Sequence, residues 1–281
     1  IFAGSHGYNT EKTPEEMLVE AAAAGGKYIL GADVTLTQTL EVAKAFELDL
    51  NGFTLTNKVD NTSTDVIVVK EGATLTLEGD GTVEAVSGND GYAVIAEGKV
   101  IINGGTYKSG LDANGDGNCT IYARGKGEVY VNGGNFSTPA GDDTTYVLNK
   151  KDADRDNTVI EVKGGTFTNF NPANNPAEGA GTNFVADGYI SKSTDGKVWT
   201  VSKMTAEDKL VAEATKGGSY TLAEDMVLSQ TLVVEKDLTL NLNGKTLSNK
   251  DYTMRSATPT TDVIIVAAGA TLTLEGDGVV E

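Results

Sequence analysis

One phrase recurs along this chain at intervals of about 25 to 31 residues. Alternating apolar residues lead into a Gly-Gly pair and then an aromatic residue in GKVIINGGTYKS (98–109), GEVYVNGGNFST (127–138) and TVIEVKGGTFTN (158–169). Looser copies stand at 47–57 and 74–84. The interval is too long for hairpins with two-residue turns, but it suits one coil of a parallel β-solenoid, whose coils stack about 4.8 Å apart. The phrase therefore predicts an all-β chain of stacked coils.

The glycines of this phrase are expected at the corners of the coils. Glycine is the residue that accepts a left-handed backbone angle or a very close backbone approach at little cost. Inward Val, Ile and Leu side chains would then form continuous apolar columns, and about six or seven coils would make a rod about 30 Å long. The glycines concerned are Gly52, Gly79, Gly104, Gly133 and Gly164.

A longer repeat contains the shorter one. Residues 13–57 align with 205–249 at roughly half of their positions, and TDVIVVKEGATLTLEGDGTVE (64–84) returns as TDVIIVAAGATLTLEGDGVVE (261–281). The second copy carries a short insertion, DYTMRSA, at 251–257. Because it holds only the first part of a module, we expect either that the native polypeptide continues or that another chain caps the open end. The predicted domains are a lead segment at 1–12, a complete module at 13–203 and the start of a second module at 204–281.

Each module is predicted to begin with a short capping helix. Thr13-Pro14-Glu15-Glu16 precedes LVEAAAA and Gly25-Gly26 follows it, which is the pattern of an N-capped helix ended by glycine. The copy at 205–218 has the same layout. Such a helix would cover the exposed end of the solenoid core and prevent edge-to-edge pairing. DGKVWTVSK (195–203), with the single Trp199, is predicted as the closing strand of the module.

Composition narrows the function classes. The chain has 34 Gly and only five Pro, and its 40 acidic against 22 basic residues give a formal charge of −18, which repels nucleic-acid backbones and anionic lipid surfaces. No run approaches the roughly 18 apolar residues of a membrane-spanning helix. The single cysteine, Cys119, excludes an intrachain disulfide and a cluster of thiolate metal ligands. We therefore expect no nucleic-acid partner and no membrane insertion.

The segments LDLNGFTLTN, GATLTLEGDGTVE, VIINGGTYKS and VYVNGGNFST show a resemblance to a known superfamily. From about residue 27 to 203 the chain resembles the right-handed parallel β-helix, or pectate-lyase-like, superfamily, and especially the tandem β-helix segments of bacterial surface adhesins and phage virion fibres. The resemblance implies right-handed solenoid modules in tandem. It says little about function, since the same fold hosts lyases, hydrolases, adhesins and fibres.

Candidate groups for catalysis are few. His6, the single histidine, precedes the first coil, and Asp142-Asp143 is predicted as a solvated turn, although paired aspartates also occur in the hydrolases of this fold. A lyase or hydrolase would have to gather the carboxylates of 112–118, 142–143 and 152–156 on one face, beside Arg124 or Arg155. An acidic surface would repel an anionic uronate polymer, although this does not exclude a lyase. Because residues suited to catalysis are scarce, no catalytic residue is predicted.

Two acidic loops are the candidate metal sites. Asp112, Asn114 and Asp116, followed by Gly117, match the first half of a calcium loop. The twelfth position holds Ala123 where an EF-hand has Glu, so calcium would need a truncated loop completed by other oxygen ligands. The second candidate set is Asp152, Asp154 and Asp156, with Arg155 among them. The competing interpretation of both segments is a hydrophilic turn between coils.

The aromatic residues Tyr107, Phe136 and Phe167 follow the Gly-Gly pairs at matching coil positions. They could form a stacked ladder in the core or an exposed row on which sugars stack. We favour the core, because a repeated register is what solenoid packing requires.

These observations predict a non-enzymatic structural or adhesive protein of an extracellular fibre, on a cell surface or a virion. Its partners would be further modules of the same chain, copies of itself, and a glycan or host-surface receptor. No cofactor is required, and calcium is the one candidate metal. Two alternatives stay open, which are a β-helix polysaccharide lyase or hydrolase and a glycan-binding module without turnover.

Overall fold

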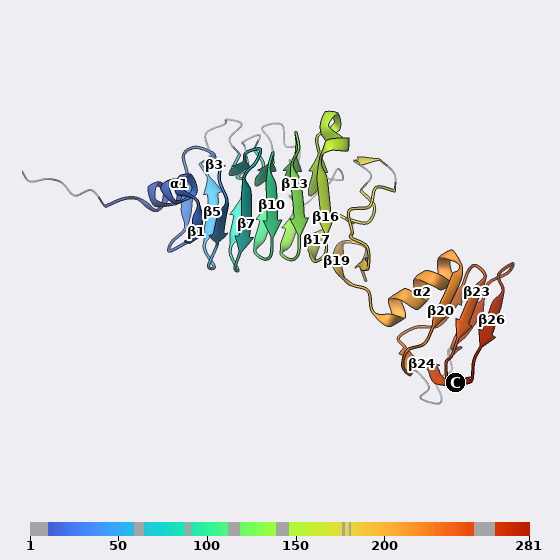
Figure 1. Cartoon of the computed structure of the whole chain (residues 1–281). Coiled ribbons are helices and arrows are strands. Elements are labelled where there is room, and N and C mark those ends of the chain that lie inside the picture. The colour runs from blue at the N-terminus through green and yellow to red at the C-terminus, as the bar shows by residue number, and fades with distance from the viewer. Residues whose placement is uncertain are drawn as a thin grey trace, which may run out of the picture. The chain divides into compact units, whose positions relative to one another are not determined.

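In the computed structural model the chain is described over residues 11–58, 65–87, 91–111, 119–138, 146–175, 178–179, 181–249 and 262–281. It divides into two compact units, Ile1–Lys203 and Met204–Glu281 (Figure 1). None of the helices in the described part of the chain is long and apolar enough to span a membrane.

In unit 1 successive strands take their places in three different sheets, so that every third strand is a neighbour (Figure 1). Sheet A contains β1 (Gly26–Ile29), β4 (Phe46–Asp49), β7 (Thr74–Glu78), β10 (Lys99–Ile102), β13 (Glu128–Val131) and β16 (Val159–Val162). Sheet B contains β2 (Val34–Leu36), β5 (Thr54–Asn57), β8 (Thr82–Glu84), β11 (Thr106–Lys108), β14 (Asn135–Ser137) and β17 (Gly165–Thr168), followed by β19 (Val198–Lys203) and β18 (Tyr189–Lys192). Sheet C contains β3 (Leu40–Val42), β6 (Ile67–Val69), β9 (Val94–Ala96), β12 (Ile121–Ala123) and β15 (Leu148–Lys150).

The strands up to β17 pair in parallel, and the chain is predominantly β, as expected and compatible with a solenoid-like fold. The register explains the interval in the sequence. Leu75, Val100 and Val129 are paired on neighbouring strands, and all three are fully buried. The alternating residues of these strands therefore stack as apolar columns, because the side-chain period of a strand is two.

The predicted capping helix is confirmed as α1 (Pro14–Ala24). The Glu16 amide donates to Thr13 Oγ1 at 3.2 Å, and the Thr13 amide donates to Glu16 Oε2 at 2.8 Å, which completes a capping box. Leu18 and Ala22 on the inner face are buried in the same core as the strands. Glu15 accepts hydrogen bonds from Thr37, just beyond β2, so the helix is fixed over the first strands.

The corner glycines divide the expected roles between two positions. Gly52 and Gly79 have left-handed φ values of 82° and 78°. In the Gly-Gly pairs the second glycine has the left-handed φ, as in Gly134 with φ 103°. The first glycine is required because a side chain there would collide with the backbone of a neighbouring turn. A Cβ on Gly133 would lie 2.6 Å from the carbonyl oxygen of Asn103 on the preceding turn.

The aromatic ladder is confirmed as part of the core. The rings of Tyr107, Phe136 and Phe167 are buried and stack in sequence, with centroids 5.1 and 4.9 Å apart and interplanar angles of 13° and 11°. Tyr107 donates its hydroxyl hydrogen to the Gly104 carbonyl at 2.9 Å, and burial raises the pKa of this phenol. This position counts against an exposed row for sugar stacking.

The predicted closing strand is confirmed as β19, and its direction is antiparallel to the coils. It pairs with β17 on one side and with β18 on the other, and Trp199 lies opposite Phe167. A short 3₁₀ helix, η1 (Asp152–Asn157), precedes β16.

Unit 2 has the same element order as the start of unit 1. Its helix α2 (Ala206–Lys216) has Thr205 and Asp208 in a capping box. Asn243 donates to the Leu222 carbonyl at 3.0 Å, just as Asn51 donates to Leu30 at 2.9 Å in unit 1. Three parallel sheets contain β20 (Gly218–Thr221), β23 (Leu238–Asn241) and β26 (Leu272–Glu275); β21 (Met226–Leu228), β24 (Lys245–Asn249) and β27 (Gly278–Val280); and β22 (Leu232–Val234) and β25 (Ile264–Val266).

Candidate functional site

The predicted site residues fall into two groups. Asp112, Asn114 and Asp116 lie outside the described residues, as do His6 and Asp142-Asp143. Asp152, Asp154 and Asp156 lie on η1, near the end of unit 1.

Two of the three aspartates of η1, Asp152 and Asp154, interact with nearby cations or with the backbone. Asp152, whose side chain is 91% exposed, pairs with Arg155 through Oδ1 and Nη2 at 2.9 Å. Asp154 Oδ2 accepts the Gly125 amide at 2.7 Å and lies 3.9 Å from Lys151 Nζ. In the described ranges no group of three or more His, Cys, Asp and Glu side chains is arranged to hold a metal ion. Calcium at the two acidic segments stays a prediction, which calorimetric titration of the chain and of its Asp112→Asn and Asp152→Asn variants tests.

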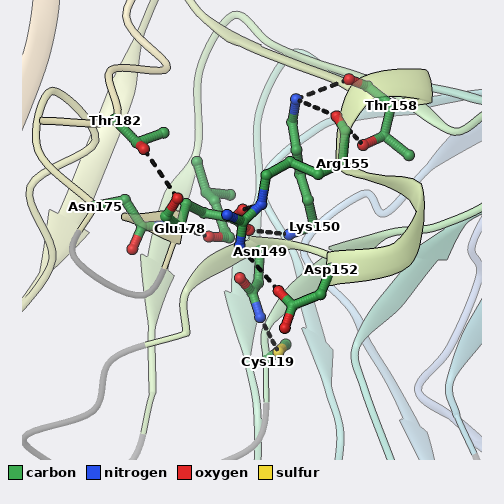
Figure 2. A network of polar contacts seen from close by, with 10 residues as sticks. Cys119, Asn149, Lys150, Asp152, Arg155, Thr158, Asn175, Glu178 and Thr182 are labelled. Atoms are coloured by element: carbon green, nitrogen blue, oxygen red, sulfur yellow. Dashed lines mark hydrogen bonds and ion pairs between the residues drawn. The ribbon is translucent and has the colours of Figure 1, made fainter. Parts of the chain in front are cut away.

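Arg155 also forms an ion pair with Glu178, a residue that was not predicted from the sequence. Glu178 belongs to the turn-rich stretch that follows β17, yet its side chain is only 1% exposed. Its Oε2 lies 2.9 Å from Arg155 Nε, and its Oε1 accepts the Lys150 amide of β15 (Figure 2). The Arg155–Glu178 contact is an ion pair without the angles of a hydrogen bond, although the two atoms are close. No periodicity in the stretch distinguishes Glu178 from a surface glutamate.

Further polar groups surround this ion pair (Figure 2). Lys150 Nζ donates to the carbonyl oxygens of Thr158 at 2.7 Å and of Arg155 at 3.4 Å. Burial of the ammonium group lowers the pKa of Lys150, and the Glu178 carboxylate opposes this shift. Asn175 Nδ2 donates to the Leu148 carbonyl at 3.0 Å, and Thr182 Oγ1 donates to the Glu178 carbonyl at 3.2 Å. The cluster therefore joins β15, η1 and the segment after β17.

This cluster holds one charged hydrogen-bond acceptor, the Glu178 carboxylate, in a fixed position. The Glu178 carboxylate is matched by a guanidinium and a backbone amide, which is how a buried charge is stabilised. Arg124, the other predicted candidate, pairs with Glu97 at 2.6 Å. The structure brings Arg155 together with Asp152, and Asp154 and Asp156 lie on the same short helix, whereas the carboxylates of 112–118 and 142–143 lie outside the described residues.

Comparison with known proteins adds no relative, since no family model, curated protein or solved structure matches this chain.

Replacing Arg155 by methionine is expected to lower the free energy of unfolding of unit 1 by about 1–3 kcal/mol. Loss of one partner from a buried pair costs about 3–5 kcal/mol, and the half-exposed Arg155 side chain reduces that figure. Urea unfolding followed by the fluorescence of Trp199 measures the loss within unit 1. Lys151→Met, which removes a long, exposed contact, is the matched control and should change the value by less than about 0.5 kcal/mol. Equal losses in the two variants would contradict the assigned ion pair.

The Cys119 thiol is expected to be unreactive in the folded chain. Burial raises its pKa to about 12, which outweighs the opposing hydrogen bond from Asn149. At pH 8 the buried thiol is therefore almost entirely protonated, whereas the thiolate is the nucleophile. A disulfide reagent should therefore label the native chain far more slowly than the urea-unfolded chain. Similar labelling rates in the two states would show that the thiol is accessible.

Proposed function

We propose that this chain is a non-enzymatic structural or adhesive protein, built of right-handed parallel β-helix modules in tandem and belonging to an extracellular fibre. The observation that carries the proposal is the return of one architecture. Unit 2 starts with the same capped helix as unit 1 and continues with strands in the same cyclic order. Near-identical modules lengthen a chain without diversifying a binding site, which suits a protein whose role depends on its length.

The position of the aromatic residues supports a structural role. The ladder of Tyr107, Phe136 and Phe167 contributes ring stacking to the core of unit 1. The charge of −18 supports a soluble surface that does not bind nucleic acids. A cell-surface or virion location, and a glycan or host-surface receptor as partner, are part of the same proposal.

Electron microscopy of the native, full-length material tests the proposal. Uniform filaments, or appendages attached to a cell envelope or a capsid, are the expected result. Small compact particles would contradict the fibre role. Calcium-dependent cleavage of acidic polysaccharides by the same material would support the alternative, a lyase of the β-helix type, and loss of cleavage in an Asp116→Asn variant would locate that activity.

A further inference from the structure

The described parts of the chain between Phe170 and Lys203 return to all three sheets of unit 1, where they contact the last coil strands β15, β16 and β17. On sheet B the strand β19 pairs with β17. On sheet A the Val162 amide donates to the Phe184 carbonyl at 2.8 Å, and the Ala186 amide donates to the Val162 carbonyl at 2.9 Å. Backbone groups therefore pair with β17 along its length and with β16 at Val162, and β18 becomes the outer strand of sheet B.

Sheet C is closed in a different way, by side chains. The Ile121 amide of β12 donates to the Val147 carbonyl at 2.9 Å, and the Lys151 amide donates to the Ala123 carbonyl at 2.8 Å. The backbone groups of Val147 and Lys151 therefore face β12. Because backbone groups alternate between the two edges of a strand, those of Leu148 and Lys150 point to the outer edge. There the Leu148 carbonyl accepts from Asn175 Nδ2, and the Lys150 amide donates to the Glu178 carboxylate (Figure 2).

Asn175 and Glu178 thus supply the two groups that another strand would supply. A neighbouring strand would offer an N–H to Leu148 and a carbonyl oxygen to Lys150, and the amide and the carboxylate replace them in turn. Arg155, which lies on η1, forms an ion pair with the Glu178 carboxylate. Glu178 is therefore bound both to β15 and to η1. We call the pair Asn175 and Glu178 the edge clasp.

We propose that the edge clasp is a lock that keeps the β15 edge of unit 1 from pairing with a second copy of this chain. An unpaired strand edge is a template for strand addition, and natural proteins cover such edges with devices of this kind. Two copies offer identical β15 edges, which can pair antiparallel about a two-fold axis. Sheet C is where we place the lock, because side chains and not a further strand pair with the outer edge of its last strand, β15.

The proposal does not rest on the fibre role, and the full chain tests it directly. In an Asn175→Ala/Glu178→Ala double variant, sedimentation velocity over a hundredfold range of concentration should show dimers that the parent chain does not form. Glu178→Gln keeps an acceptor oxygen for the Lys150 amide and should sediment like the parent. Leu48→Ala, which truncates a fully buried core residue elsewhere in unit 1, controls for loss of stability alone.

Hydrogen exchange keeps the test decisive even where the double variant folds poorly. In the single variant Glu178→Ala the Lys150 amide should exchange at least tenfold faster than in the parent chain, while in Glu178→Gln it should stay protected. Unchanged protection of this amide in Glu178→Ala would overturn the clasp. Faster exchange without association in either the single or the double variant would overturn the lock, as would equal association by Leu48→Ala.

Discussion

Replacing Phe136 by alanine is expected to lower the free energy of unfolding of unit 1 by about 3–5 kcal/mol, the usual cost of removing a buried aromatic ring. The ring is 1% exposed and lies between Tyr107 and Phe167, with both of which it stacks at about 5 Å. Its removal leaves a cavity in the middle of the ladder and ends both ring contacts. Urea unfolding followed by Trp199 fluorescence measures the change, because this tryptophan lies opposite Phe167 at the end of the ladder.

Tyr130→Ala is the matched control for this prediction. Tyr130 lies on β13 of the same coil, and its partly exposed side chain donates its hydroxyl hydrogen to Glu128 at 3.2 Å. Removing it should cost less than about 1 kcal/mol, since surface substitutions seldom cost more. A loss as large as that of Phe136→Ala would show that the outer face contributes as much as the ladder.

The second large effect is expected from the smallest possible change, Gly127→Ala. A Cβ at this position would lie 2.0 Å from the carbonyl oxygen of Ala96 on the preceding coil and 3.1 Å from that of Arg124. Both obstacles are backbone atoms, and the nearer one belongs to a neighbouring strand, so the backbone itself would have to move. We expect a loss of about 3 kcal/mol, at the upper end of the range for overpacking, in the same unfolding experiment.

Gly31→Ala separates the effect of space from the general effect of replacing glycine. A Cβ on Gly31 has no neighbour within 4 Å, and its backbone lies outside the left-handed region. This variant should gain about 0.4–1 kcal/mol, because alanine reduces the entropy of the unfolded chain. A neutral Gly127→Ala would contradict the close approach of Gly127 to the Ala96 carbonyl. A destabilised Gly31→Ala would contradict the open space beside Gly31.

The features that could be predicted from sequence are those that repeat. The Gly-Gly phrase recurs because every coil needs a corner, and the apolar residues before it recur because each strand faces the same core. The ladder of Tyr107, Phe136 and Phe167 was predictable for the same reason. The helix α1 was predictable from Thr13 and Glu16, because a capping box is a local interaction.

The features that could not be predicted occur once and depend on distant partners. Glu178 and Asn175 lie outside the coil repeat, in a stretch of Asn, Pro, Ala and Gly, and their partners Lys150 and Leu148 are 28 and 27 residues away in sequence. Asp154, a predicted calcium ligand, accepts the amide of Gly125, 29 residues away. Only the position of β15 and η1 in the folded unit shows why these side chains are needed.

The position of β19 has a mechanical consequence. Any tension that passes along the chain from one unit to the next enters unit 1 at Lys203, the last residue of this strand. β19 is hydrogen-bonded on both sides, to β17 and to β18, whereas a coil at the end of a stack has a neighbour on one side only. A pull on Lys203 therefore acts on the hydrogen bonds of β19 with β17 and β18 before it reaches the last coil, so β19 is the strand that bears the load.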